Sequence, residues 1–249
     1  MLWFVGLGLW DLEDVSLRGR RAIADADRVF LEGYTSRLGG AALAAMEAAW
    51  GRPVTVLSRV DVESRPDEVL EAARAGKAVF LVPGDPMVST THVDLRLRAQ
   101  ALGIETRIVH GASIATAAPG LAGLQNYRFG PATSLPFPHG RWRPTSPVTA
   151  IRENLQRDLH TLVYLDIQPG RCMLIPEALD LLEAAAEETG LEIPLYVGCA
   201  RVGSPDPVVA AGTADRLRGV DFGGPLHILI VPGELHVMER EYLEVFAGL

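Results

Sequence analysis

Short apolar runs that alternate with helical patterns limit what this chain can fold into more than any other feature. In the first half we expect strands at residues 2–6, 28–32, 53–57, 77–82 and 105–109, and helices at 16–26, 41–50, 65–75 and 90–102. The strands are nearly continuous apolar runs, as in a sheet whose two faces are both covered by helices. The pattern therefore predicts an α/β fold.

The second half repeats this alternation with different spacing. Strands are expected at 132–136, 160–166, 194–200 and 226–231, and helices at 113–123, 146–158, 175–188 and 237–246. Five prolines between positions 131 and 147 interrupt regular structure there. Because 249 residues suit two domains of moderate size, we place α/β domains at residues 1–112 and 113–249.

Composition and charge exclude several classes of protein. The 31 acidic residues outnumber the 23 basic ones and leave a net charge of −8, so direct binding of nucleic acid is not expected. The one dense basic cluster, Arg18, Arg20 and Arg21, lies in a predicted helix, where a solvated face is the commoner explanation.

No apolar run approaches the roughly 20 residues of a membrane-spanning helix, and no signal-peptide pattern opens the chain. We therefore expect a cytoplasmic protein.

The sequence lacks the local motifs of metal and phosphate sites. Its histidines and cysteines form no HExxH or CxxC pattern, so no metal site is predicted. Gly6 ends the first expected strand and Gly8 follows it, but Asp11 replaces the third glycine of a GxGxxG fingerprint. Lys77 stands outside any GxxxxGK pattern. The two glycines still allow close backbone approach, either in a simple turn or beside a ligand.

Two further loops follow strands and carry polar residues. Residues 83–88 read Pro-Gly-Asp-Pro-Met-Val, with a carboxylate at Asp85, and residues 110–113 read His-Gly-Ala-Ser. Ligands of open α/β sheets bind beyond the carboxyl ends of the strands, which favours a site here. The alternative is a pair of turns before capped helices, with Thr90, Thr91 or Ser113 as the caps.

Eight motifs along the chain together indicate a family. They are GLGL (6–9), EGYTSRL (32–38), GDPMVSTTH (84–92), HGASI (110–114), GLQNYRFG (123–130), RDLHTLVYLDI (157–167), ARVGSPDP (200–207) and PLHILIVPGELHVMEREYL (225–243). With these motifs in this order, the chain resembles the diphthine synthases of the tetrapyrrole-methylase superfamily along essentially its whole length.

The resemblance implies a reaction and an assembly. Members use S-adenosylmethionine to methylate the amino group of a 3-amino-3-carboxypropyl side chain on one histidine of translation elongation factor 2. The products are diphthine and S-adenosylhomocysteine. Members are homodimers of two-domain α/β chains, with the cofactor in the cleft between the domains.

The resemblance also implies which residues bind the cofactor. In the first domain these are Leu9, Asp85, Val88, Ser113 and Ile114. In the second domain they are Leu165, Val202 and His227. No catalytic side chain and no metal ligand is implied.

The chemistry of methyl transfer agrees with this set. Direct displacement at a sulfonium needs a bound cofactor and an aligned neutral nucleophile more than a protein nucleophile. As a base, the sequence offers nothing better than scattered histidines such as His92, His160 and His227. Two alternatives stay open: a tetrapyrrole C-methyltransferase with the same fold and cofactor, and a non-enzymatic module that binds a nucleotide or a partner.

Overall fold

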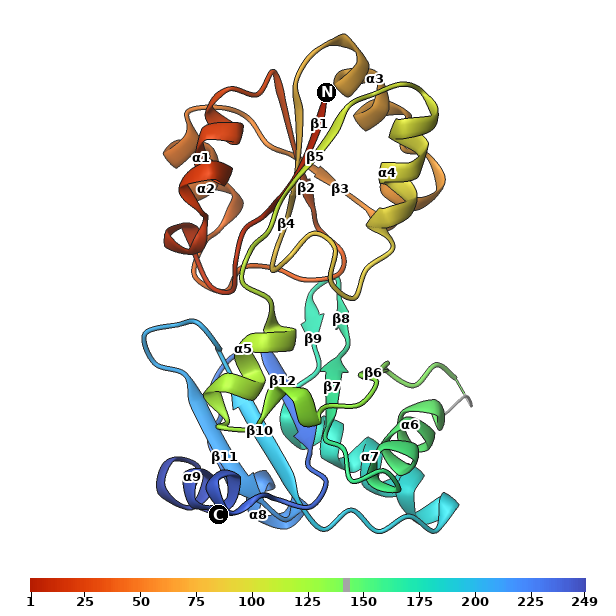
Figure 1. Ribbon diagram of the computed structural model, residues 1–249, viewed down its shortest axis with the longest axis vertical. Coiled ribbons are helices and arrows are strands. Elements are labelled where there is room, and N and C mark those ends of the chain that lie inside the picture. The colour runs from red at the N-terminus through yellow and green to blue at the C-terminus, as the bar shows by residue number, and fades with distance from the viewer. Residues whose placement is uncertain (141–143) are drawn as a thin grey trace. The chain divides into compact units, whose positions relative to one another are not determined.

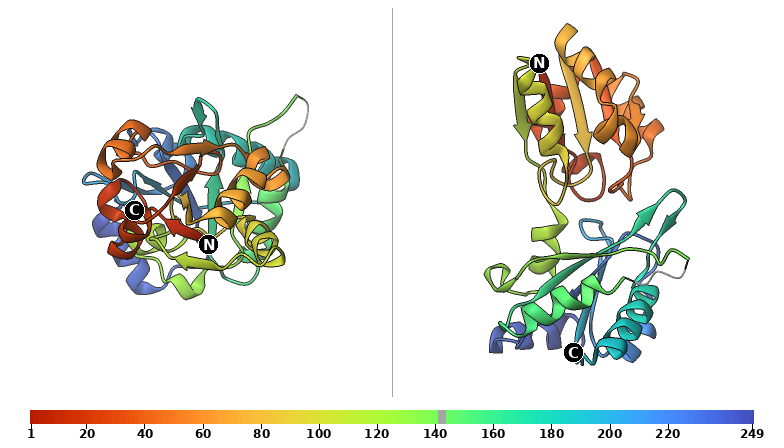
Figure 2. Two further views of the ribbon diagram at one scale, coloured as in Figure 1. Left: turned by 90° about the horizontal axis from the view of Figure 1, so that it is seen from above. Right: turned by 90° about the vertical axis from the view of Figure 1, so that its right-hand side faces the viewer.

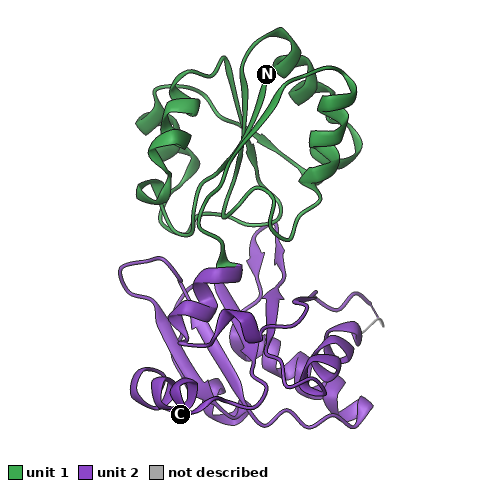
Figure 3. Ribbon diagram, in the orientation of Figure 1, with its two compact units in different colours: residues 1–114 green, residues 115–249 purple. Residues whose placement is uncertain are grey.

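A computed structural model describes residues 1–140 and 144–249 of the chain. These residues form two compact units, Met1–Ile114 and Ala115–Leu249 (Figure 3). The division falls two residues beyond the expected boundary between 112 and 113. Each unit contains its own five-stranded sheet with helices packed against it.

Unit 1 contains a parallel sheet in the order β3-β2-β4-β1-β5. Its strands are β1 (Leu2–Gly6), β2 (Arg28–Glu32), β3 (Thr55–Leu57), β4 (Ala78–Val82) and β5 (Thr106–Val109). Helices α1 (Leu17–Ala24) and α2 (Leu43–Trp50) cover one face, and α3 (Asp67–Ala75) and α4 (His92–Ala101) cover the other (Figure 1). The carboxyl ends of all five strands therefore lie at one edge of the sheet.

The side chains of β4 show why this strand is an unbroken apolar run. Ala78, Phe80 and Val82 belong to the core cluster on the α3 and α4 side. Val79 and Leu81 belong to the cluster on the α1 and α2 side. Because both faces of a strand inside such a sheet are buried, every position must be apolar.

Unit 2 contains a mixed sheet in the order β11-β10-β12-β7-β6. Its strands are β6 (Thr133–Leu135), β7 (Thr161–Leu165), β10 (Tyr196–Ala200), β11 (Val208–Gly212) and β12 (His227–Val231), and only β6 and β7 pair in parallel. A short hairpin of β8 (Ile167–Gln168) and β9 (Arg171–Cys172) follows β7 (Figure 2). The helices are α5 (Ile114–Leu121), α6 (Ser146–Leu155), α7 (Ile175–Thr189), α8 (Ala214–Arg218) and α9 (Val237–Phe246).

The α/β prediction is confirmed, with differences in unit 2. Strand β11, helix α8 and the β8–β9 hairpin were not predicted from the sequence. These elements are short, and β11 ends in small residues that carry little strand signal. An antiparallel strand covered on both faces also shows the same apolar run as a parallel one, so β12 did not reveal its direction. No helix in residues 1–140 or 144–249 has the length and apolar character needed to cross a membrane.

Candidate functional site

Three loops meet at the carboxyl edge of the unit 1 sheet. Strand β1 lies between β4 and β5 and is parallel to both, so the loops that follow these strands are neighbours. The loops after β1 and β4 also pair through their backbones. Gly84 donates its N–H to the Gly8 carbonyl at 2.7 Å, and Gly8 donates to the Gly84 carbonyl at 3.3 Å.

Glycines make this close approach of three backbones possible. A Cβ atom on Gly6 would lie 2.6 Å from both the Gly84 oxygen and the Gly111 nitrogen. A Cβ atom on Gly111 would lie 2.5 Å from the Gly84 oxygen. Any side chain at Gly6 or Gly111 would therefore push the loops apart, so these glycines hold the three backbones in contact.

Asp85 connects two of these loops. Its side chain is 6% exposed, and its carboxylate accepts hydrogen bonds from the Met87 N–H at 2.9 Å and the Gly111 N–H at 3.3 Å. The Nδ1–H of His110 donates to the same carboxylate at 2.7 Å. Asp85 therefore orders its own loop and the loop after β5.

His110 belongs to a loop predicted to lie at the site, but it was not among the predicted cofactor-binding residues. Its side chain is 72% exposed although Nδ1 is held by Asp85. An aspartate in the loop after β4 and a histidine in the loop after β5 could have indicated this pair, since both strands lie beside β1. That signal becomes visible only when the strand order is known.

The other four residues predicted in unit 1 lie in the same loops. Leu9 donates its N–H to Asp14 at 3.0 Å. Val88 is 39% exposed, Ser113 is buried, and Ile114 is the first residue of α5. The fold thus brings all five predicted positions of unit 1 to one edge of the sheet.

His92 holds the loop after β4 through a buried hydrogen bond. Its ring is fully buried with an edge-on contact to Phe80, and Nδ1–H donates to the Pro86 carbonyl at 3.0 Å. Burial lowers the pKa of His92, so the ring is neutral. Nε2 has no hydrogen-bond partner among the described residues. The residue positions the loop and is inaccessible as a base.

The three residues predicted in unit 2 also converge. Strand β12 lies between β10 and β7 and is antiparallel to both, with Ala200 opposite His227 and Tyr164 opposite Ile228. The start of β12 therefore lies beside the ends of β10 and β7. Leu165 is the last residue of β7, His227 is the first residue of β12, and Val202 lies two residues after the end of β10. All three are buried.

The polar atoms of His227 are bonded within unit 2. Nε2–H donates to the Gly224 carbonyl at 3.1 Å, and Nδ1 accepts the N–H of Ile175 at 3.2 Å. Burial lowers the pKa of His227, so this ring is neutral as well. The backbone and the apolar surface of the ring are what this residue offers to a ligand.

Comparisons with known proteins decide the family. The profile of the Tetrapyrrole (Corrin/Porphyrin) Methylases matches residues 1–218. The diphthine synthase of Methanosphaerula palustris is 60% identical over 249 residues, which cover 100% of this chain and 99% of that protein. The diphthine synthase of Methanoregula boonei is 59% identical, with 100% of both chains covered. The chain belongs to the diphthine synthase family of tetrapyrrole methylases.

Solved structures agree with membership of the diphthine synthase family. A crystal structure of diphthine synthase superposes with a TM-score of 0.93 at 43% identity, covering 99% of this chain and 96% of that one. The putative diphthine synthase of Entamoeba histolytica gives a TM-score of 0.88 at 35% identity, covering 99% and 98%. The resemblance drawn from the motifs is confirmed, and the chain is a methyltransferase of diphthamide biosynthesis. The tetrapyrrole C-methyltransferase and the non-enzymatic module are not favoured.

Proposed function

We propose that this chain uses S-adenosylmethionine to methylate the amino group of the 3-amino-3-carboxypropyl-histidine of translation elongation factor 2, giving diphthine and S-adenosylhomocysteine. The observation that carries the proposal is the 60% identity to a diphthine synthase along the whole chain. We further propose that the reaction takes place in the cytoplasm.

The edge of the unit 1 sheet suits S-adenosylmethionine. Gly6, Gly84 and Gly111 keep side chains away from three adjoining backbones, Val88 supplies exposed apolar surface, and Asp85 supplies a carboxylate. Mostly apolar sites with a few polar groups bind ligands of this kind. When bound, the cofactor supplies an electrophilic methyl group.

We assign the cofactor contacts to the positions expected from the sequence. The set comprises Leu9, Asp85, Val88, Ser113 and Ile114 of unit 1 and Leu165, Val202 and His227 of unit 2. Their task is to hold the methyl donor and to align the substrate nitrogen with it, since alignment is the main requirement of a direct displacement.

The proton of the substrate amine does not need a buried histidine. His160 is fully buried: its Nε2–H donates to Glu239 at 3.1 Å, and its Nδ1 accepts the Gly233 N–H at 2.9 Å. His92 and His227 are also buried and neutral. A primary α-amine has a reference pKa of about 7.7–8.0, so a useful fraction is already neutral near pH 7. We therefore propose no catalytic side chain.

Labelled S-adenosylmethionine tests the proposal. We expect label to pass to elongation factor 2 that carries the 3-amino-3-carboxypropyl-histidine, and not to the unmodified factor. Label found in a tetrapyrrole precursor, or in neither substrate, would contradict the proposed reaction.

We also propose a homodimer, formed through α2. This helix is rich in alanine and only Met46 is buried, while Leu43 is 37% exposed. Light scattering should give about twice the chain mass of 26.8 kDa, and Ala45→Glu with Ala49→Glu should lower it to the mass of one chain. A wild-type mass near that of one chain would refute the dimer.

A further inference from the structure

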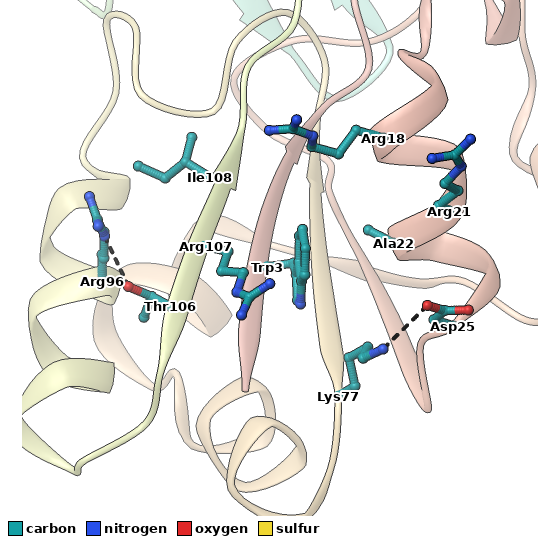
Figure 4. Close-up of a pocket in the computed structure, with 10 residues that line it drawn as sticks. All are labelled: Trp3, Arg18, Arg21, Ala22, Asp25, Lys77, Arg96, Thr106, Arg107 and Ile108. Atoms are coloured by element: carbon teal, nitrogen blue, oxygen red, sulfur yellow. Dashed lines mark hydrogen bonds and ion pairs between the residues drawn. The ribbon is translucent and has the colours of Figure 1, made fainter.

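A concave basic surface lies on unit 1. A cavity of about 470 Å³ is lined by five cationic side chains around Trp3, namely Arg18, Arg21, Lys77, Arg96 and Arg107 (Figure 4). The lining contains one carboxylate, Asp25. We call this surface the basic groove. It concentrates positive charge on a chain whose net charge is −8.

Three of the five cations in the basic groove, Arg18, Arg21 and Arg96, form no ion pair with a carboxylate among the described residues. Lys77 lies 3.5 Å from Asp25, and Arg107 donates to Glu105 at 3.0 Å. The guanidinium groups of Arg18 and Arg21 have no ion-pair or hydrogen-bond partner within residues 1–140 and 144–249. They are one turn apart on α1, so both guanidinium groups are available to an anionic partner from the same helix face.

The basic groove extends around the edge strand β5. Arg107 is in register with Trp3, which packs on the α1 side of the sheet. The guanidinium of Arg107 lies 5.1 Å from the centre of the Trp3 ring. Ile108 packs on the opposite side, where Arg96 donates to Thr106 at 3.0 Å. The lining therefore includes side chains from both faces of β5.

The outer edge of β5 is suited to an extended peptide. Among the described strands, β5 pairs only with β1. The Leu2 N–H donates to the Glu105 carbonyl at 2.8 Å, so the backbone of Glu105 faces β1. Because backbone groups alternate along a strand, those of Thr106 and Ile108 point away from β1, toward the open side. An extended segment can add to such an edge.

Most of the basic groove lies at the other edge of the sheet from the loops assigned to the cofactor. Arg18, in the first turn of α1, is the lining residue nearest to those loops in the chain. Trp3, Lys77 and Thr106 lie at the amino-terminal ends of their strands, whereas Gly8 and Asp85 follow the carboxyl ends. Trp3 lies three residues before Gly6, the last residue of β1, which is about 10 Å of strand at 3.3 Å per residue. A ligand of the groove would therefore act as a docking element rather than as a reactant.

We infer that the basic groove binds a carboxylate-rich, extended segment of the protein substrate. This inference rests on the proposed function, since that function supplies a protein partner. Arginine pairs with carboxylates in two-point hydrogen bonds, and the free edge of β5 supplies backbone partners that only a peptide would use. The net acidic chain does not favour a nucleic-acid strand. A charged edge residue that blocks aggregation would explain Arg107 alone, but not the unpaired arginines of α1.

Peptide binding tests the basic groove directly. The probe is a fluorescein-labelled octapeptide of alternating Glu and Val, measured by anisotropy with the full chain at low and high salt. Binding should weaken at least tenfold in the double variant Arg18→Gln with Arg21→Gln, and it should also weaken with salt. The matched control is Arg74→Gln with Arg157→Gln, two exposed arginines elsewhere that carry the same change of charge.

Several results would overturn the inference. One is an equal loss of affinity for the Glu-Val octapeptide in both double variants. Another is equal or tighter binding of a Lys-Val octapeptide or of an oligouridylate. A third is a change in the mass of the Arg18 and Arg21 variant measured by light scattering. The last result would show that the groove is an interface between copies of the chain.

Methyl transfer gives a second, independent measurement. The KM for the modified elongation factor should rise at least tenfold in the Arg18 and Arg21 variant, while kcat and the affinity for S-adenosylhomocysteine stay unchanged. An unchanged KM would overturn the inference. If the wild-type chain does not methylate the factor, the proposed function fails, and the peptide measurement still decides whether the basic groove binds acidic segments.

Discussion

At the scale of single residues, Asp85 has a second task besides the cofactor contact proposed for it. Its carboxylate accepts hydrogen bonds from Met87, His110 and Gly111, so it is occupied in ordering two loops. A carboxylate that holds the binding loops in place contributes to affinity even where it does not touch the ligand itself.

Asp85→Ala should weaken the binding of S-adenosylhomocysteine roughly tenfold or more, since a hydrogen bond to a charged group contributes about 1.5–3 kcal/mol. Isothermal titration calorimetry with one expected site per chain measures the change. Asp67→Ala is the control, because Asp67 is an exposed acid in the first turn of α3. Equal affinity of wild type and the Asp85 variant would remove this residue from the site.

The substrate amine, rather than a histidine, should set the pH dependence of the rate. The single-turnover rate of the first methylation is expected to rise with pH through the pKa of the amine and to level off above it. His110 is the histidine to test, because its ring is exposed at the candidate site. His110→Gln should leave the pH range over which the rate rises unchanged. If the variant instead loses this rise of the rate with pH, and its rate is at least 10²-fold lower, which is the scale of general-base catalysis, His110 is the base.

At the scale of elements, the contact of three strand ends depends on glycine. The Cβ atom that Gly111→Ala adds would stand 2.5 Å from the Gly84 carbonyl oxygen. The loops after β4 and β5 must then separate, so we expect a lower urea midpoint and loss of S-adenosylhomocysteine binding.

Gly120→Ala is the matched control for this prediction. Gly120 lies in α5, and a Cβ atom there would meet nothing within 4 Å. Because alanine favours a helix more than glycine does, the control should keep or raise the urea midpoint. Similar losses of binding in both variants would show that the close contact is not the cause.

At the scale of the whole molecule, buried neutral histidines should make the folded state sensitive to acid. Burial lowers the pKa values of His92, His160 and His227 below the ordinary value of 6.5. The unfolded chain therefore binds protons that the folded chain does not, and stability is lost as the pH falls below about 6.5. Each such histidine contributes at most about 1.4 kcal/mol per pH unit.

Urea unfolding at pH 7.5, 6.5 and 5.5 measures this effect, and the midpoint should fall over the interval. His160→Gln should reduce the slope, whereas His139→Gln should not, because His139 is exposed. A midpoint independent of pH would contradict the assignment.

Burial opposes ionisation of Glu239, but hydrogen bonds from Gln125, His236 and His160 outweigh it and lower its pKa. The ionised Glu239 carboxylate therefore stabilises the folded state at neutral pH, and this stabilisation is lost only as the pH falls below about 4.5.

The sequence by itself determined the features that depend on neighbouring residues. Apolar runs and helical periods located β1, β4, β12 and most helices to within about two residues, because such patterns are local properties of a chain. The order of the motifs determined the family, and their places after strands located the candidate loops. The direction of β12 was not determined, because burial of both faces yields one pattern for either direction.

Only the tertiary structure decided which distant residues act together. It paired Asp85 with His110, and it showed that the ring nitrogens of His160 and His227 are already bonded. It also gathered Arg18 and Arg21 with Arg96 and Arg107, which belong to separate elements, into one groove. The reason is physical: hydrogen bonds, burial and charge act through space, and residues far apart in the chain become neighbours only when the strand order is formed.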